Sequence, residues 1–363
     1  MFWRKRKKGN SGEATFKARV SEFWQWFEKN AQYFYDQIEA GKCPELQPEV
    51  SEAVSKLGLV AWVFGPGPED KGGHSFTLSG EGILHKQFLT QYWLEQAPDL
   101  PGWTFYGERQ PGNVNTEECI EIAGRSFCFG ELWLSPKINH ENEVIDITAW
   151  HHHFADVDSD AKKTVLFLML DGVLGEFGTD NWIGKIDISD DRLADAIQII
   201  ELRDFILDIE IKNGWEKHPP TEAYTLYEIP ELDKSFRRSD IFAGSTANYD
   251  LIREFMNSDG QMENLLIGTG ADFIYVAFST SIVPSGSEVD FRAELEDSIN
   301  GVLKSQLSGR VFGGAFSRQS VYIDMIIFDG INSIQLLEQF LRGKNLPEAS
   351  INYFERNKKS IRV

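Results

Sequence analysis

The order of strand-like and helix-like segments constrains the fold of this chain more than any other feature. Alternating apolar and polar residues predict strands, and apolar residues spaced three and four apart predict helices. Two stretches of the first half follow the order β-β-α-β, with segments at 59–65, 74–79, 82–97 and 103–109 and again at 127–135, 143–152, 159–178 and 182–189. A long amphipathic segment at 190–211 predicts one more helix.

The last third follows a related order. After a strand at 223–230 and a helix at 246–258, the pattern predicts β-α-β-β-α-β, with segments at 272–281, 287–306, 310–317, 320–329, 332–343 and 349–357. Units of this kind fold most easily as sheets covered by helices. We therefore predict an α+β protein with antiparallel or mixed sheets, ferredoxin-like in the C-terminal half.

The same pattern, with the chain length of 363 residues, predicts more than one domain. We expect a basic disordered tail, an N-terminal α+β domain of two β-β-α-β units, a helical linker and a C-terminal ferredoxin-like α+β domain. Their boundaries are 1–20, 21–190, 191–220 and 221–363.

Several short motifs of the first half resemble those of one bacterial family. These motifs are "FWQWF" at 23–27, "AP-DLPGW" at 97–103, "LDGVLGEFG" at 170–178 and "IGKIDI" at 183–188. Together they make residues 21–189 similar to an uncharacterised family of bacterial cytosolic proteins of unknown function. The resemblance implies no activity, cofactor or catalytic residue.

The charge distribution bears on the choice of partner. The chain has a formal charge of −20, its first eight residues carry +5 and its last eight carry +4, so the body between them carries −29. Such a surface repels nucleic acid and anionic lipid and attracts basic proteins. The basic N-terminus alone is too short for stable membrane association. We expect a basic protein as partner, no nucleic acid and no stable membrane association.

Cysteine usage and targeting signals predict the compartment. Three cysteines, Cys43, Cys119 and Cys128, lack C-x-x-C spacing and predict neither a disulfide framework nor a thiolate zinc site. Carboxylates flank Cys119 in "EECIE", which disfavours a catalytic thiolate. No secretory signal and no apolar run of bilayer length is present. These features predict a cytoplasmic protein.

The stretch "ITAWHHHFADVDSD" at 147–160 offers a candidate metal site. On a strand, His151 and His153 would point to one face, about 7 Å apart along the backbone, and Asp156, Asp158 or Glu176 could complete a site. That spacing suits a divalent metal, the only cofactor that the sequence suggests. The competing interpretation is a strand end before a solvated turn.

A second candidate is the pair of carboxylates in "LDGVLGEFG", Asp171 and Glu176. Two carboxylates can divide acid and base roles when burial separates their pKa values. Five residues apart on a helix they do not share a face, and Gly172 and Gly175 indicate a helix ending or close packing instead.

No other catalytic constellation is recognisable in the sequence. The chain has no complete nucleotide-binding fingerprint, and no histidine follows His218. We therefore predict a non-enzymatic acidic interaction protein that binds a basic protein or peptide. Two alternatives stay open: a metal-dependent hydrolase centred on His151 and His153, and a structural homo-oligomer.

Overall fold

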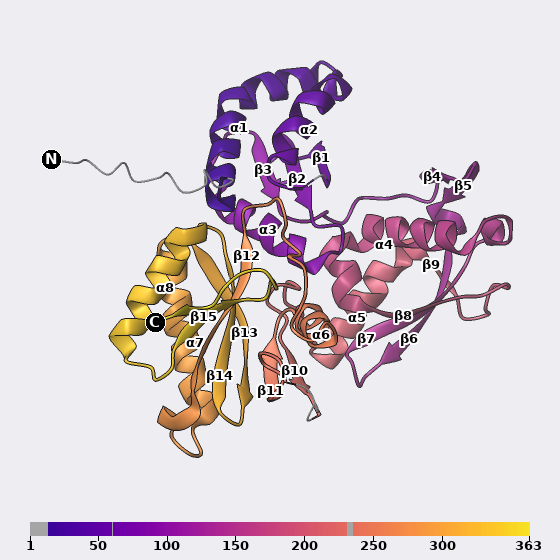
Figure 1. Cartoon of the computed structure of the whole chain (residues 1–363). Coiled ribbons are helices and arrows are strands. Elements are labelled where there is room, and N and C mark those ends of the chain that lie inside the picture. The colour runs from indigo at the N-terminus through magenta and orange to yellow at the C-terminus, as the bar shows by residue number, and fades with distance from the viewer. Residues whose placement is uncertain (1–13, 60, 231–234) are drawn as a thin grey trace. The chain divides into compact units, whose positions relative to one another are not determined.

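The computed structural model describes residues 14–59, 61–230 and 235–363, and Figure 1 shows its helices and strands. The α-helices of this part are α1 (Phe16–Glu39), α2 (Gln47–Ser55), α3 (Leu84–Glu95), α4 (Ser159–Trp182), α5 (Leu202–Asn213), α6 (Tyr249–Asn257), α7 (Glu288–Ser305) and α8 (Gly330–Lys344). The strands form mixed and antiparallel sheets, and together with the helices they make an α+β fold, as the sequence predicts.

The chain divides into two compact units. Of the described residues, unit 1 comprises 14–59, 96–100, 224–230 and 235–363, and unit 2 comprises 61–95 and 101–223. This division differs from the predicted boundaries, because the segment 21–60 groups with the C-terminal part and the expected linker 191–220 belongs to unit 2. Of the expected tail 1–20, residues 1–13 lie outside the described residues, while α1 begins at Phe16.

Helix α1 begins inside the segment 1–20 that was expected to be a disordered tail, and Thr15 caps it. The Thr15 side chain accepts a hydrogen bond from the Ala18 N–H, which satisfies one of the free donors of the first turn. The backbone then ties this end of the helix into unit 1, since Phe16 N–H donates to the Gly270 carbonyl and Lys17 N–H to that of Phe328.

Unit 1 is built on one seven-stranded sheet in the order β10-β11-β13-β14-β12-β15-β16. Its strands are β10 (Thr225–Glu228), β11 (Ile241–Thr246), β12 (Asp272–Ser279), β13 (Gly309–Ser317), β14 (Ser320–Ile327), β15 (Ser350–Tyr353) and β16 (Ile361–Arg362). Alternate residues of β12 and β14 bury their side chains against α7 and α8, which lie along this sheet in Figure 1. The intervening residues, among them Tyr275 and Asp324, are buried on the other face.

The C-terminal segment from β12 to β15 has the element order β-α-β-β-α-β predicted from the sequence. All pairings between its four strands are antiparallel, in the order β13-β14-β12-β15. This is the order of a split β-α-β unit. Because β10, β11 and β16 extend the sheet, the ferredoxin-like description of the whole C-terminal half stays a prediction.

Unit 2 contains three small sheets. The first has the order β1-β2-β3, the second is the hairpin β4-β5, and the third has the order β8-β7-β6-β9. Their strands are β1 (Ala61–Pro66), β2 (His74–Ser79), β3 (Trp103–Tyr106), β4 (Cys119–Ile122), β5 (Arg125–Cys128), β6 (Trp133–Asn139), β7 (Val144–Trp150), β8 (Ile183–Ile188) and β9 (Ile197–Gln198). Both β-β-α-β segments are therefore present, as β1-β2-α3-β3 and β6-β7-α4-β8.

Two details of unit 2 differ from the sequence prediction. The segment 190–211 is not one helix, because Ile197–Gln198 pairs with β6 as β9 and α5 begins only at Leu202. The hairpin β4-β5 interrupts the predicted strand 127–135, which divides into the end of β5, a short 3-10 helix at Phe129–Glu131 and the start of β6. Throughout the described residues, every helix is too short or too polar to cross a bilayer.

Candidate functional site

Unit 2 has an open groove of about 680 Å³. Four separate segments line it: the β1–β2 hairpin, the end of β3, the segment 109–114, and one side of α4. The lining residues are Val63, Gly65, Pro66, Gly67, Pro68, Glu69, Ser75, Thr77, Tyr106, Arg109, Gln110, Pro111, Gly112, Asn113, Val114, Leu168, Asp171 and Gly172. Since no single motif spans them, the sequence carries no local signal for this groove.

A kink in α4 shapes one wall of the groove. Gly175 lies inside the helix with φ 74° and ψ 169°, a conformation that side chains with a Cβ disfavour. A Cβ at this position would lie 2.8 Å from both the Arg109 carbonyl oxygen and Pro111 Cδ. Gly175 therefore permits the segment 109–111 to approach the helix, which confirms the close packing that the sequence indicated there.

Glu176, the residue after the kink, holds several segments of unit 2 together through hydrogen bonds to its buried carboxylate. Its side chain is 2% exposed and accepts hydrogen bonds from Ser79 Oγ (2.7 Å), the Gly82 N–H (3.0 Å), Gln87 Nε2 (3.3 Å) and the Arg109 N–H (3.3 Å). The Glu176 N–H also donates to the Arg109 carbonyl at 2.9 Å. Because its oxygens are occupied by these donors, we interpret Glu176 as a positioning residue.

The groove itself is electronegative. Asp171 lines it, and burial, reinforced by the nearby charge of Glu176, raises the pKa of the Asp171 carboxyl. Burial also raises the pKa of Glu108, again with a contribution from Glu176. Arg109, the one basic residue of the lining, pairs with Glu81 at 3.2 Å, and its charge only partly offsets the rise in the pKa of Asp171. An incoming cation would relieve the repulsion among these carboxylates.

The predicted histidine site has a different geometry from the one expected. Strand β7 ends at Trp150, and His152–Asp156 forms a 3-10 helix with His151 as its N-cap. The strand placement of His151 and His153 was therefore wrong. His153 Nδ1 lies 3.1 Å from Asp156 Oδ2, and Arg125 Nε lies 3.5 Å from the same carboxylate oxygen. The assignment of His151, His153 and Asp156 as metal ligands stays a prediction.

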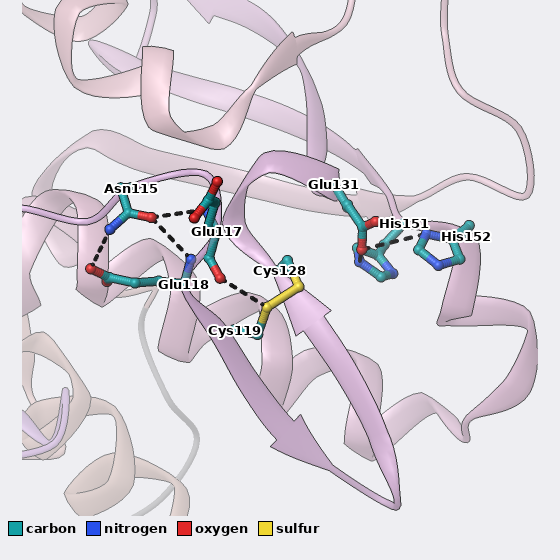
Figure 2. The surroundings of a disulfide bond; sticks show 8 residues. All are labelled: Asn115, Glu117, Glu118, Cys119, Cys128, Glu131, His151 and His152. Atoms are coloured by element: carbon teal, nitrogen blue, oxygen red, sulfur yellow. Dashed lines mark hydrogen bonds and ion pairs between the residues drawn. A yellow bond between two sulfur atoms is a disulfide. The ribbon is translucent and has the colours of Figure 1, made fainter.

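The structure brings His151 and His152 together with Glu131 instead (Figure 2). One ligand atom from each lies within 4.8 Å of the others, and His151 Nε2 is 3.7 Å from Glu131 Oε2. However, His151 Nδ1 accepts a hydrogen bond from the His153 N–H at 3.1 Å, so the neutral ring carries its proton on Nε2. A metal on Nε2 would displace that proton to Nδ1 and break the cap, whereas metal-bound histidines usually donate through the other nitrogen.

Replacing His151 by alanine tests this interpretation. Burial is the main cause that lowers the pKa of His151 to about 4, so the ring is neutral at pH 7 and acts as cap and core side chain. We expect His151→Ala to destabilise unit 2 by about 1–2 kcal/mol, the usual cost of a lost N-cap, and exposed His152→Ala to cost much less. Thermal melts with EDTA and with zinc measure both variants. A zinc-dependent rise in Tm that both variants abolish would contradict the capping role.

The cysteine prediction needs a correction. Cys119 and Cys128 lie directly opposite each other on β4 and β5 and form a disulfide (Figure 2). The odd number of cysteines and the absence of C-x-x-C spacing concealed this pair, since register in a hairpin, rather than a motif, brings the two sulfurs together. Cys43 is the remaining free cysteine. The argument from cysteine usage for a reducing compartment therefore no longer holds.

Comparisons with known proteins identify no relative: no protein-family model, no curated protein and no solved structure matches the chain. The resemblance of residues 21–189 to a bacterial family stays a prediction.

Proposed function

We propose that the protein is a non-enzymatic binding protein whose unit 2 groove holds a basic segment of a partner protein. The observation that carries this proposal is the position of Asp171, a half-buried carboxylate that lines the groove beside other carboxylates. A lysine or arginine side chain placed there would form a charge-assisted hydrogen bond with Asp171. The cytoplasmic location predicted from the sequence is part of the proposal.

The lining suits a long basic side chain in two respects. Val63 and Leu168 expose 47% and 39% of their surface, which gives the methylene stem of a lysine or arginine apolar surface to cover. Glu69 adds a second carboxylate to the lining, so a segment with two basic residues could pair with both. The formal charge of −20 on the whole chain would steer such a segment toward the protein at low ionic strength.

Titration with an octalysine peptide tests the proposal. We expect binding at low ionic strength that weakens as salt screens the charges. Asp171→Asn removes one charge with little change in volume and should weaken binding roughly tenfold, about 1.4 kcal/mol. Asp208→Asn, on the exposed side of α5 in the same unit, removes the same charge and serves as the matched control. Equal affinities for the two variants would show that the peptide senses only the overall charge.

The pH dependence of binding has a defined sign. The pKa of Asp171 is raised in the free protein, and a bound cation would lower it again, so the complex binds fewer protons than its components. Affinity should therefore be full above the raised pKa of Asp171 and fall as the pH drops through it. Calorimetry in buffers of different ionisation enthalpy measures the released proton, and the Asp171→Asn variant should lack that proton.

The two alternatives make different predictions in the same experiments. A metal-dependent hydrolase requires a metal that His151 can ligate only by giving up its capping hydrogen bond. A structural homo-oligomer predicts that light scattering detects a concentration-dependent mass in the absence of peptide.

A further inference from the structure

The disulfide Cys119–Cys128 lies at one end of the segment that forms a wall of the groove. Residues 109–114 line the groove, and the chain then reaches β4, which begins at Cys119. We propose that thiol–disulfide exchange at Cys119–Cys128 controls the order of this wall and thereby the affinity of the groove. The affinity part of this inference rests on the proposed function, whereas the redox chemistry and the ordering of the wall do not.

The wall is held at two ends by different interactions. Near the groove, the Gly112 N–H donates to the Gly172 carbonyl at 2.8 Å, and the Glu176 N–H donates to that of Arg109 at 2.9 Å. At the other end, the Phe129 N–H donates to the Glu118 carbonyl at 2.9 Å, and the Gly130 N–H donates to that of Thr116 at 3.1 Å. The second pair of hydrogen bonds directly flanks the two cysteines.

The hairpin that carries the disulfide has little other support from backbone pairing. Strands β4 and β5 are four residues each and, among the described residues, pair only with each other. An isolated two-stranded hairpin is marginally stable in water. The fully buried side chain of Phe127 anchors β5 in the core, whereas β4 exposes Cys119 and Glu121 and contacts that core through the partly buried Ile120 and Ile122. The disulfide is therefore the covalent link between the more deeply buried strand β5 and the strand β4, which continues into the wall.

Cys119 is the exposed partner and the accessible sulfur for attack. A thiolate of a dithiol reductant attacks Cys119 Sγ, the bond between the two cysteine sulfurs breaks, and Cys128 leaves as a thiolate that takes up a proton. The second thiol of the reductant then attacks the mixed disulfide and releases Cys119, so that the reductant is oxidised by two electrons and the protein is reduced by two. The Cys119 sulfur lies 3.2 Å from the Glu117 carbonyl oxygen, an acceptor for the thiol once it forms (Figure 2).

Reduction should loosen β4 and the segment before it while the core of unit 2 stays folded. Asn115 illustrates what would be lost: its Oδ1 accepts hydrogen bonds from the Glu117 and Glu118 N–H groups at 2.8 and 3.2 Å, which orders the turn that enters β4 (Figure 2). If only about a tenth of the reduced molecules keep an ordered wall, the apparent Kd for a groove ligand rises about tenfold.

The test compares the oxidised full-length chain, the chain reduced with dithiothreitol, and the Cys119→Ser/Cys128→Ser variant. Cys43→Ser removes the free cysteine of unit 1 and is the matched control. Amide hydrogen exchange reports on residues 109–122, and octalysine titration reports on the groove. We expect at least about tenfold faster exchange in 109–122 in both disulfide-free forms, about tenfold weaker peptide binding, and no change from Cys43→Ser.

The outcomes separate this inference from the proposed function. Unchanged exchange in 109–122 after complete reduction, verified by thiol labelling of both cysteines, would overturn the control of the wall. Faster exchange with unchanged peptide affinity would overturn its link to binding. If the oxidised protein binds no peptide at all, the proposed function fails, while the exchange experiment still decides the redox control of the wall. If the double variant unfolds globally, amide exchange is fast throughout unit 2. In that case the exchange of residues 109–122 in the reduced wild-type chain decides whether the disulfide controls the wall.

Discussion

Asp324→Asn is expected to destabilise the sheet of unit 1 by about 3–5 kcal/mol, the largest single effect that the structure predicts. Asp324 is fully buried in β14 and receives two hydrogen bonds from Arg238, whose Nη1 and Nη2 lie 2.5 and 3.0 Å from its oxygens. Arg238 is 2% exposed, and its guanidinium carbon lies 4.6 and 4.8 Å from the ring centroids of Tyr275 and Tyr322. Removing the carboxylate charge would leave a buried cation that faces neutral aromatic rings, those of Tyr275, Tyr322 and Phe354, without the countercharge of Asp324.

A double variant distinguishes loss of the ion pair from simple loss of packing. Replacing both partners, as Arg238→Met/Asp324→Leu, removes both charges, and buried pairs replaced in this way often cost little. We therefore expect most of the stability lost in Asp324→Asn to return in the double variant. Hydrogen exchange of the β12–β14 amides measures the stability of this sheet directly. If the stability losses of the two single substitutions simply added in the double variant, the ion pair would not be the source of the loss seen in Asp324→Asn.

Glu176→Ala is expected to lower the stability of unit 2 by about 3 kcal/mol and to abolish peptide binding to the groove. The substitution leaves the buried Ser79 hydroxyl and the partly buried N–H groups of Gly82 and Arg109 without this acceptor, and each unsatisfied buried donor costs about 1–3 kcal/mol. It also removes the link from α4 to the end of β2 and the loop after it, through Ser79 and Gly82, and to Arg109 in the lining of the groove. Urea unfolding and octalysine titration measure the two effects.

Asp208→Ala is the matched control for this prediction, because Asp208 is an exposed acidic residue on a helix of the same unit. Its free energy of unfolding should change by less than about 0.5 kcal/mol. A Glu176→Ala protein as stable as the control, or one that binds the peptide normally, would contradict the positioning role of Glu176.

The sequence predicted the elements of this fold better than their grouping. Periodicity is a local property, and it located α3, α4, α7 and α8 together with the strands around them. The assignment of α1 and α2 to a compact unit depends on contacts between residues distant in the chain, such as Phe16 with Gly270. No periodicity reports such contacts. The hairpin β4-β5 was missed because its short strands carry a weak alternating pattern.

The candidate site was less accessible to sequence reasoning than the fold. Asp171 and Glu176 stood out as a carboxylate pair. Only the structure shows that Asp171 lines the groove, whereas Glu176 is buried behind it and holds neighbouring segments in place. His151 was expected to lie on a strand. In the structure the strand ends before it, and His151 caps a short 3-10 helix by accepting a hydrogen bond from the His153 N–H. The disulfide follows from the register of β4 and β5, which two isolated cysteines in a sequence do not reveal.

Reversal of the charge at position 171 tests the central claim, that the groove of unit 2 binds a basic segment through Asp171. The measurement is the ratio of affinities for octalysine and octaglutamate, in the wild-type chain and in Asp171→Lys, at one ionic strength. The account predicts that the substitution lowers this ratio at least about tenfold more than Asp208→Lys does, since opposite charges attract and like charges repel at short range. An equal change in the two variants would contradict the claim, because the peptide would then respond to the net charge of the protein and not to the groove.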